Sequence, residues 1–250
     1  MRQSDRLDTI LTRLSENGSV GVTGLAQDLG VSMATIRRDL ELLESQRLLS
    51  RTHGGAVSHG VLYELPLRYR SGRHEAEKHR IAEAAAERLG DARVVGLTGG
   101  TTTTEVARRI AGRTLTIVTN ALNIAAELAV RPNLKLVVTG GVARPESYEL
   151  VGPLADSTLD VLNIDVVFVG VDGASRAGMT THHEIEAHTD RRMIERAHRV
   201  VVVCDASKIG RSALAVICQA RQIDELITDS AADRAGLDEL RAAGIRVITV

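Results

Sequence analysis

The apolar residues near the start of the chain follow the spacing of short helices. In the first predicted helix they recur at intervals of three and four positions, at Leu7, Ile10, Leu11 and Leu14. That spacing places side chains on one helix face, and Gly18 is expected to end the helix. A second helix is expected to have Thr23 as its cap and to end at Gly30. Its apolar residues are Leu25, Ala26 and Leu29.

A third helix is predicted to begin after Ser32, a residue that can cap it. Its apolar stripe consists of Met33, Ile36, Leu40 and Leu43. A short β-ribbon is expected next, with residues 48–51 in one strand, a turn at 53–55 and residues 56–57 in the other. Two helices joined by a three-residue turn and followed by a ribbon predict a winged helix-turn-helix domain over residues 1–57.

The pattern changes after this domain. Residues 58–75 have mixed character and are expected to form a linker with one helical turn. From residue 76 onward, helices alternate with short, β-branched apolar runs, which are typical of parallel strands buried on both faces. Residues 76–250 are therefore predicted to form a doubly wound, mostly parallel α/β domain that binds ligands at the carboxyl ends of its strands. The predicted strands are residues 93–97, 115–119, 134–139, 166–171, 200–204, 225–228 and 246–250.

Composition narrows the functional classes. The 250 residues are 44% hydrophobic and 25% charged, which suits a soluble globular protein. Aromatic residues make up only 2%, which argues against a base-stacking surface for single-stranded nucleic acid. No apolar run approaches the ~20 residues of a membrane span, and no signal peptide is visible. Cys204 ends an apolar run and is expected to be a buried free thiol, as suits a cytoplasmic protein.

The third predicted helix separates its apolar stripe from a basic face. Arg38 lies opposite the stripe on a helical wheel, and Thr35 and Arg37 lie on the flanks. Such a helix can enter a major groove, where arginine binds phosphates or the edge of guanine. Arg51 and His53 on the ribbon are placed to contact DNA phosphates. The alternative is that both helix arginines only solvate the surface, because this domain carries seven basic and seven acidic residues.

A loop rich in glycine and threonine is the most specific sequence feature of the second domain. It follows the strand at 93–97 and opens a helix expected at 105–110. Glycines let a ligand approach the backbone, and helix N-terminal amides with threonine hydroxyls bind anions such as phosphate. The loop lacks the lysine of a nucleotide P-loop and the spacing of a dinucleotide fingerprint. A tight turn capped by threonine is the alternative. The candidate ligand residues in the loop are Thr98, Gly99, Gly100, Thr101 and Thr102.

Further candidate ligand residues follow four other predicted strands: Asn120, Gly141, Asp172 and Lys208. Strand ends converge at one crevice in this kind of fold, and Lys208 can supply the positive charge that opposes a phosphate. Glu186 is a candidate for contact with a sugar hydroxyl. The histidine-rich stretch 182–188 is not expected to hold a metal, because its histidines diverge around a helix and too few ligands share one face.

Two motifs resemble the DeoR family of bacterial transcriptional regulators. They are Ser32-x-x-Thr35-Ile36-Arg37-Arg38-Asp39-Leu40 and Arg51-x-His53-Gly54-Gly55-Ala56. The resemblance covers nearly the whole chain. It implies that Thr35, Arg37 and Arg38 face DNA and that Asp39 pairs with an arginine. It also implies an effector domain similar to sugar-phosphate isomerases, which senses a phosphorylated sugar. The chain departs from the family loop Asp-Ser-Gly-Thr-Thr, because Thr98 stands where that loop has a carboxylate.

These features predict a transcriptional repressor of carbohydrate-metabolism genes that a phosphorylated sugar releases from double-stranded operator DNA. A homodimer or homotetramer is expected, because one recognition helix covers few base pairs. No cofactor, metal, membrane partner or catalytic residue is expected. The alternative is a sugar-phosphate isomerase-like enzyme with an accessory DNA-binding domain, since Asp172, Glu184 and Glu186 are available as a carboxylate base. A third, weaker alternative is an interaction module with a vestigial site.

Overall fold

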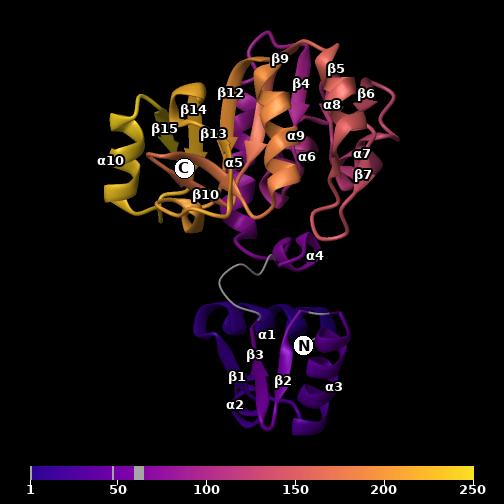
Figure 1. Cartoon of the computed structure of the whole chain (residues 1–250), viewed down its shortest axis with the longest axis vertical. Helices are drawn as coiled ribbons and strands as arrows, with labels where there is room; N and C mark the ends of the chain where they lie inside the picture. The colour runs from indigo at the N-terminus through magenta and orange to yellow at the C-terminus, as the bar shows by residue number, and fades with distance from the viewer. Residues whose placement is uncertain (1, 47, 59–64) are drawn as a thin grey trace. The chain divides into compact units, whose positions relative to one another are not determined.

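The chain divides into two compact units. The computed structural model describes residues 2–46, 48–58 and 65–250 (Figure 1). One unit extends to Arg73, and the other begins at His74. We call them the N-terminal and C-terminal units. The division falls within the segment 58–75 that was expected to be a linker, and residues 59–64 of that segment lie outside the described residues.

The N-terminal unit contains the three predicted helices and a small antiparallel sheet. Gly18 and Gly30 end the first two helices, as expected. The sheet has the order β1-β3-β2, and its first strand was not predicted. The elements are α1 (Gln3–Asn17), β1 (Ser19–Gly21), α2 (Val22–Leu29), α3 (Met33–Ser45), β2 (Ser50–Thr52), β3 (Gly55–Val57) and α4 (Leu67–Arg70).

The core of the N-terminal unit forms where the apolar faces of α1, α2 and α3 pack together. Tyr69 of α4 packs against the same core, so the short helix contributes to the N-terminal unit. The other fully or nearly buried side chains include Leu7, Ile10, Leu11, Leu14, Ile36, Leu40, Leu43 and Leu49.

Two local predictions in this unit are wrong. Thr23 does not cap α2, because the helix starts two residues earlier, at the buried Val22, and Gly21 takes the cap position. Met33 does not belong to the core and is 46% exposed. On the helical wheel it lies at the edge of the stripe, so the first residue of α3 falls at the rim of the packed face.

The C-terminal unit is built on a seven-stranded sheet whose strands are all parallel. The strand order is β15-β14-β12-β9-β4-β5-β6, and all seven strands were predicted. The chain builds the sheet outward from β4 to β6, then returns beside β4 and builds the other half. Their bounds are β4 (Val94–Leu97), β5 (Leu115–Thr119), β6 (Leu134–Val138), β9 (Ile164–Gly170), β12 (Ala197–Val203), β14 (Glu225–Thr228) and β15 (Arg246–Thr249).

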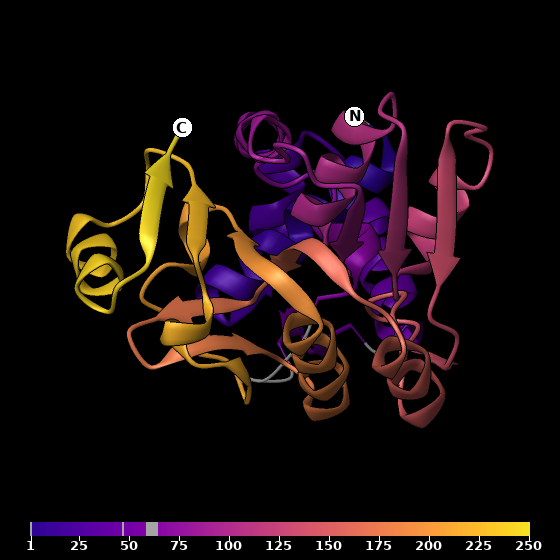
Figure 2. The same ribbon diagram turned by 90° about the horizontal axis from the view of Figure 1, so that it is seen from above.

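Helices cover both faces of this sheet (Figure 2). Phe168 faces the layer formed by α5, α6 and α7, whereas its neighbours Val167 and Val169 face α8, α9 and α10. Because both faces of the strand are buried, consecutive positions are all apolar, which explains the continuous apolar runs in the sequence. The helices are α5 (Glu75–Glu87), α6 (Thr101–Ile110), α7 (Leu122–Leu128), α8 (Pro153–Asp160), α9 (Glu184–Glu195) and α10 (Arg234–Ala242).

Smaller elements that were not predicted lie outside the seven-stranded sheet. They are a two-stranded hairpin, an antiparallel three-stranded sheet and two short 3-10 turns. Their bounds are β7 (Val142–Ala143), β8 (Leu150–Val151), β10 (Gly173–Ser175), β11 (Gly178–Thr181), η1 (Ala206–Lys208), β13 (Ala215–Cys218) and η2 (Ala220–Gln222). Cys204 and Cys218 are both buried and free, which confirms the expectation for Cys204. In the described parts of the chain, no helix has the length and apolarity to cross a membrane.

Candidate functional site

Helix α3 presents a polar face away from the core of the N-terminal unit. The side chain of Ser32 caps it by accepting a hydrogen bond from the Thr35 N–H at 3.1 Å, as predicted. Arg37 and Arg38 are exposed, and neither makes a hydrogen bond or ion pair with another described residue. Because the opposite stripe is buried, the basic face is free to meet a large partner.

A buried ion pair fixes this helix on α1. The Arg6 guanidinium donates two hydrogen bonds to the Asp39 carboxylate, with Nη2 at 3.0 Å from Oδ1. Gln3 donates a third at 3.2 Å. Asp39 is 1% exposed, so its charge is almost fully removed from water. The two-pronged geometry sets the rotation of α3 and therefore the direction in which its arginines point.

The ribbon packs against the same helix. Arg51 Nη1 lies 3.0 Å from Glu41 Oε1, and the Arg51 N–H donates to Glu44 at 2.9 Å. His53 is exposed at the turn between β2 and β3. Arg51 was expected to contact phosphate, and here it engages two carboxylates of α3. An exposed pair of this kind contributes only about 0–1 kcal/mol, so a phosphate can exchange for it.

The glycine- and threonine-rich loop leads directly into α6. This helix begins at Thr101, so the predicted start at residue 105 is wrong. The hydroxyls of Thr103 and Thr104 donate to the Gly100 carbonyl at 3.0 and 2.6 Å, which holds the first turn closed. Thr98 is fully buried, and its hydroxyl accepts the Gly170 N–H at 3.0 Å. That bond ties the end of β4 to the end of β9.

The structure brings three more of the predicted ligand residues to this end of the sheet. Asn120 follows β5, Asp172 follows β9, and Lys208 ends η1 after β12. The Lys208 ammonium lies 3.5 Å from Asp172 Oδ1, and the Thr181 hydroxyl donates to the other carboxylate oxygen at 3.1 Å. Gly141 has a packing role, because a Cβ there would lie 2.7 Å from the Val151 carbonyl oxygen.

Two acidic residues on α9 face the same region. Glu186 and Asp190 lie one turn apart, and both are at least 97% buried. Arg144 pairs with Glu186. Burial raises the pKa of Asp190 well above its usual range, and the charges of Glu186 and Asp172 raise it further, against a hydrogen bond from Asn120 that lowers it. Asp190 therefore keeps its proton at pH values where an exposed aspartate is ionised.

Glu149 is a candidate site residue that the sequence did not predict. It directly precedes β8 and is 6% exposed. Its Oε2 accepts a hydrogen bond from Asn120 Nδ2 at 3.1 Å, and Asn120 Nδ2 also donates to Asp190 at 3.3 Å. The four-residue spacing of Glu186 and Asp190 on an inward helix face is a signal that reasoning from sequence could have used. No comparable signal marks Glu149.

The arrangement suits a polyhydroxy anion. Carboxylate oxygens accept hydrogen bonds from hydroxyls, whereas Lys208 and the amides at the start of α6 attract negative charge. In the described residues, no group of three or more histidine, cysteine, aspartate or glutamate side chains is placed to hold a metal ion. His183 instead caps α9 by accepting the Ile185 N–H at 3.2 Å.

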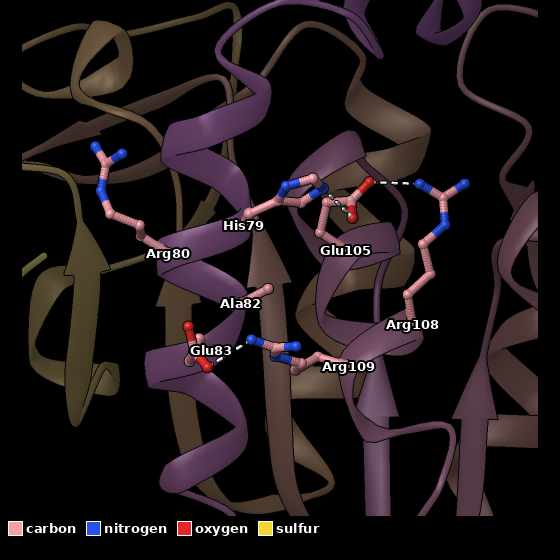
Figure 3. A pocket seen from close by; sticks show the side chains of 7 residues that line it. All are labelled: His79, Arg80, Ala82, Glu83, Glu105, Arg108 and Arg109. Carbon is pink, nitrogen blue, oxygen red and sulfur yellow. Dashed lines mark hydrogen bonds and ion pairs between the residues drawn. The ribbon is translucent and has the colours of Figure 1, made fainter.

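A separate hollow of about 320 Å³ lies between α5 and α6 (Figure 3). His79 lies 3.1 Å from Glu105, which also pairs with Arg108, and Arg109 pairs with Glu83. Arg80 pairs with Glu77, so each of the three arginines in this hollow lies beside a carboxylate. Its lining residues are His79, Arg80, Ala82, Glu83, Glu105, Arg108 and Arg109.

Comparison with known proteins gives matches along nearly the whole chain. A family model described as the DeoR-like helix-turn-helix domain matches residues 6–60, and one described as the DeoR C terminal sensor domain matches residues 73–230. A protein of Escherichia coli O157:H7 named for transcriptional repression of the aga operon is 38% identical, over 99% of this chain and 94% of that protein.

Two further relatives carry related names. The HTH-type transcriptional regulator GlpR of Haloferax volcanii is 37% identical, over 99% of this chain and 98% of its own length. The glycerol-3-phosphate regulon repressor of Escherichia coli K12 is 32% identical, over 92% of each chain. The similarity therefore spans both units in each relative.

The buried ion pair makes a testable contribution to stability. Asp39→Ala leaves the Arg6 charge buried without its partner, so we expect the free energy of unfolding of the N-terminal unit to fall by about 3 kcal/mol or more. Urea unfolding followed by circular dichroism measures this. The exposed Glu41→Ala serves as the control and should change it by less than about 1 kcal/mol.

A double variant that lacks both charges distinguishes the cost of an unpaired buried charge from the cost of lost packing. Arg6→Met with Asp39→Leu removes both buried charges and should recover most of the lost stability. Equal unfolding midpoints for Asp39→Ala and Glu41→Ala would show that the pair does not hold α3 in place.

Proposed function

Because the chain belongs to the DeoR family of transcriptional regulators, we propose that its N-terminal unit binds operator DNA through α3 and that its C-terminal unit binds a phosphorylated sugar that releases the operator. The protein is a transcriptional repressor and not an enzyme, in line with the names of its relatives. The isomerase alternative is therefore set aside. A repressor of this kind acts in the cytoplasm.

The DNA contacts we propose follow from the exposed face of α3. Arg38 and Arg37 enter the major groove, with Thr35 at the helix start, and arginine pairs with the O6 and N7 atoms of guanine. Arg51 and His53 contact the phosphate backbone from the ribbon. The Arg6–Asp39 pair supports this arrangement because it fixes the orientation of α3.

The effector site we propose is the crevice at the carboxyl ends of β4 and β9. The observation that carries this proposal is the reversal of strand order between those two strands, the point at which ligands bind in open α/β sheets. The phosphate would lie at Gly100–Thr102 on the amides that begin α6, with Lys208 opposite, because the Glu149 carboxylate lies against Gly99. One relative is named for a glycerol-3-phosphate regulon, which supports a phosphorylated polyol or sugar as the ligand class.

We also propose that the protein binds DNA as a homodimer or homotetramer. A single recognition helix reads few base pairs, so specific binding needs two half-sites about one helical turn apart or a multiple of it. Closed symmetry of two or four copies supplies the matching arrangement of recognition helices.

The Arg38 side chain should be required for specific binding. Loss of a two-pronged arginine–guanine contact costs about 1–3 kcal/mol, so Arg38→Ala should weaken binding roughly tenfold to a hundredfold. Fluorescence anisotropy with an operator selected by the wild-type protein from random DNA measures the affinity. Arg13→Ala removes the same charge from α1 and should bind normally. Normal binding by Arg38→Ala would show that another surface reads the operator.

The effector response should depend on Lys208. Without ligand, Lys208→Ala should bind the operator as the wild type does, because the residue lies in the C-terminal unit. Glycerol 3-phosphate, ribose 5-phosphate and fructose 6-phosphate are the probes, with the matching unphosphorylated compounds as controls. We expect at least one phosphate ester to release the wild type from DNA, and Lys208→Ala to respond at least tenfold more weakly.

The matched control for charge is Lys135→Ala, which removes an exposed lysine from β6. This variant should respond as the wild type does. Release by the unphosphorylated compounds at equal concentration, or a normal response from Lys208→Ala, would contradict the proposed phosphate site.

A further inference from the structure

A buried amide in the crevice has one atom without a partner. Asn120 is fully buried, and its Nδ2 donates to both Glu149 and Asp190. Its Oδ1 is also buried and accepts no hydrogen bond from any residue that the structure describes. A buried acceptor without a donor is costly, and a ligand hydroxyl is the kind of donor that would satisfy it.

Hydrogen bonds hold the backbone on both sides of Glu149, whose side chain contacts the Asn120 amide. The Leu150 N–H donates to the Asn120 carbonyl at 2.7 Å, and the Leu122 N–H donates to the Tyr148 carbonyl at 2.9 Å. Tyr148 has a φ of 63°, in the left-handed region that a large side chain rarely adopts. These constraints direct the Glu149 carboxylate inward and hold it there.

The loop after β4 leaves room for this carboxylate. A Cβ at Gly99 would lie only 2.1 Å from Glu149 Oε1 and 2.4 Å from its Cγ, so any side chain at Gly99 would displace it. Thr98, which stands where the DeoR family loop has an acid, uses its hydroxyl to join β4 to β9. The acid on this side of the crevice therefore comes from the residue before β8 rather than from the loop.

We propose that Glu149, together with Asn120 and Asp190, binds the hydroxyl groups of the effector and so determines which phosphorylated compound is recognised. This inference rests on the proposed function and adds a second subsite to it. A carboxylate is a strong acceptor for hydroxyl donors and repels phosphate. The polyol part of the ligand therefore lies against Glu149, whereas the phosphate lies toward the start of α6 and Lys208.

The test compares Glu149→Gln with Glu146→Gln. Glu146 lies in the same segment with its side chain 44% exposed, so it is the matched control. Isothermal titration calorimetry is run on the full chain with inorganic phosphate and with whichever of glycerol 3-phosphate, ribose 5-phosphate and fructose 6-phosphate binds the wild type most tightly. Glu149→Gln should bind that ester roughly tenfold to a hundredfold more weakly. Inorganic phosphate should bind it as tightly as the wild type or more tightly, and Glu146→Gln should match the wild type for both.

Other outcomes overturn the inference in distinguishable ways. Equal weakening of the ester and inorganic phosphate would mean that Glu149 supports the phosphate site. Equal strengthening would mean that its carboxylate only covers that site, and no change would mean that it touches no ligand. A wild-type chain that binds none of the three esters would overturn the proposed effector site and this inference together.

A second variant tests the inference independently in case Glu149→Gln does not fold. Gly99→Ala places a methyl group where the carboxylate lies, so it should also reduce the preference for the ester over inorganic phosphate. Thermal unfolding identifies which variants are folded. An unchanged preference in a folded Gly99→Ala protein counts against the inference as directly as an unchanged preference in Glu149→Gln.

Discussion

The reversal of strand order between β4 and β9 is the constraint on which the rest of the C-terminal unit depends. The helices that follow these two strands, α6 and α9, pack on opposite faces of the sheet, which is the arrangement that places ligand sites at the carboxyl ends of strands. The Thr98 hydroxyl bridges the two ends by accepting the Gly170 N–H. Residues that are far apart in the sequence, such as Asn120 and Asp190, meet there because parallel strands end at the same edge.

Glu149, Glu186 and Asp190 are acidic side chains that are all buried at this end of the sheet. Desolvation of a carboxylate is costly unless it is paired or protonated, and the structure uses both solutions. Arg144 and Lys208 pair with Glu186 and Asp172, and burial raises the pKa of Asp190, which favours its protonated form. The unpartnered Asn120 oxygen is a further cost. Such local costs are typical of binding sites, where a ligand supplies the missing interactions.

Elements with a strong local pattern could be predicted from the sequence. The three N-terminal helices and all seven parallel strands follow from apolar periodicity and from Gly18, Gly30 and Ser32 at the helix ends. The placement of Asn120, Asp172 and Lys208 after neighbouring strands was also predictable, because parallel strands end at the same edge of the sheet. Contacts between distant segments were not. The Glu149 carboxylate comes from the segment before β8 and fits into the space that Gly99 leaves because it has no side chain. The partner of Asp39 is Arg6, which lies on a different helix. Neither contact produces a periodic pattern in the sequence that could predict it.

Hydrogen–deuterium exchange on the full chain can locate the bound ligand and so tests whether a phosphorylated sugar binds at the ends of β4 and β9. The measurement compares the protein alone with the protein saturated by the phosphate ester that releases it from DNA, and with the same compound lacking phosphate. We expect slower exchange at the amides of residues 98–104 and 146–151 with the ester only. Protection confined to other parts of the chain, or equal protection by the unphosphorylated compound, would contradict a phosphorylated-sugar site at the ends of β4 and β9.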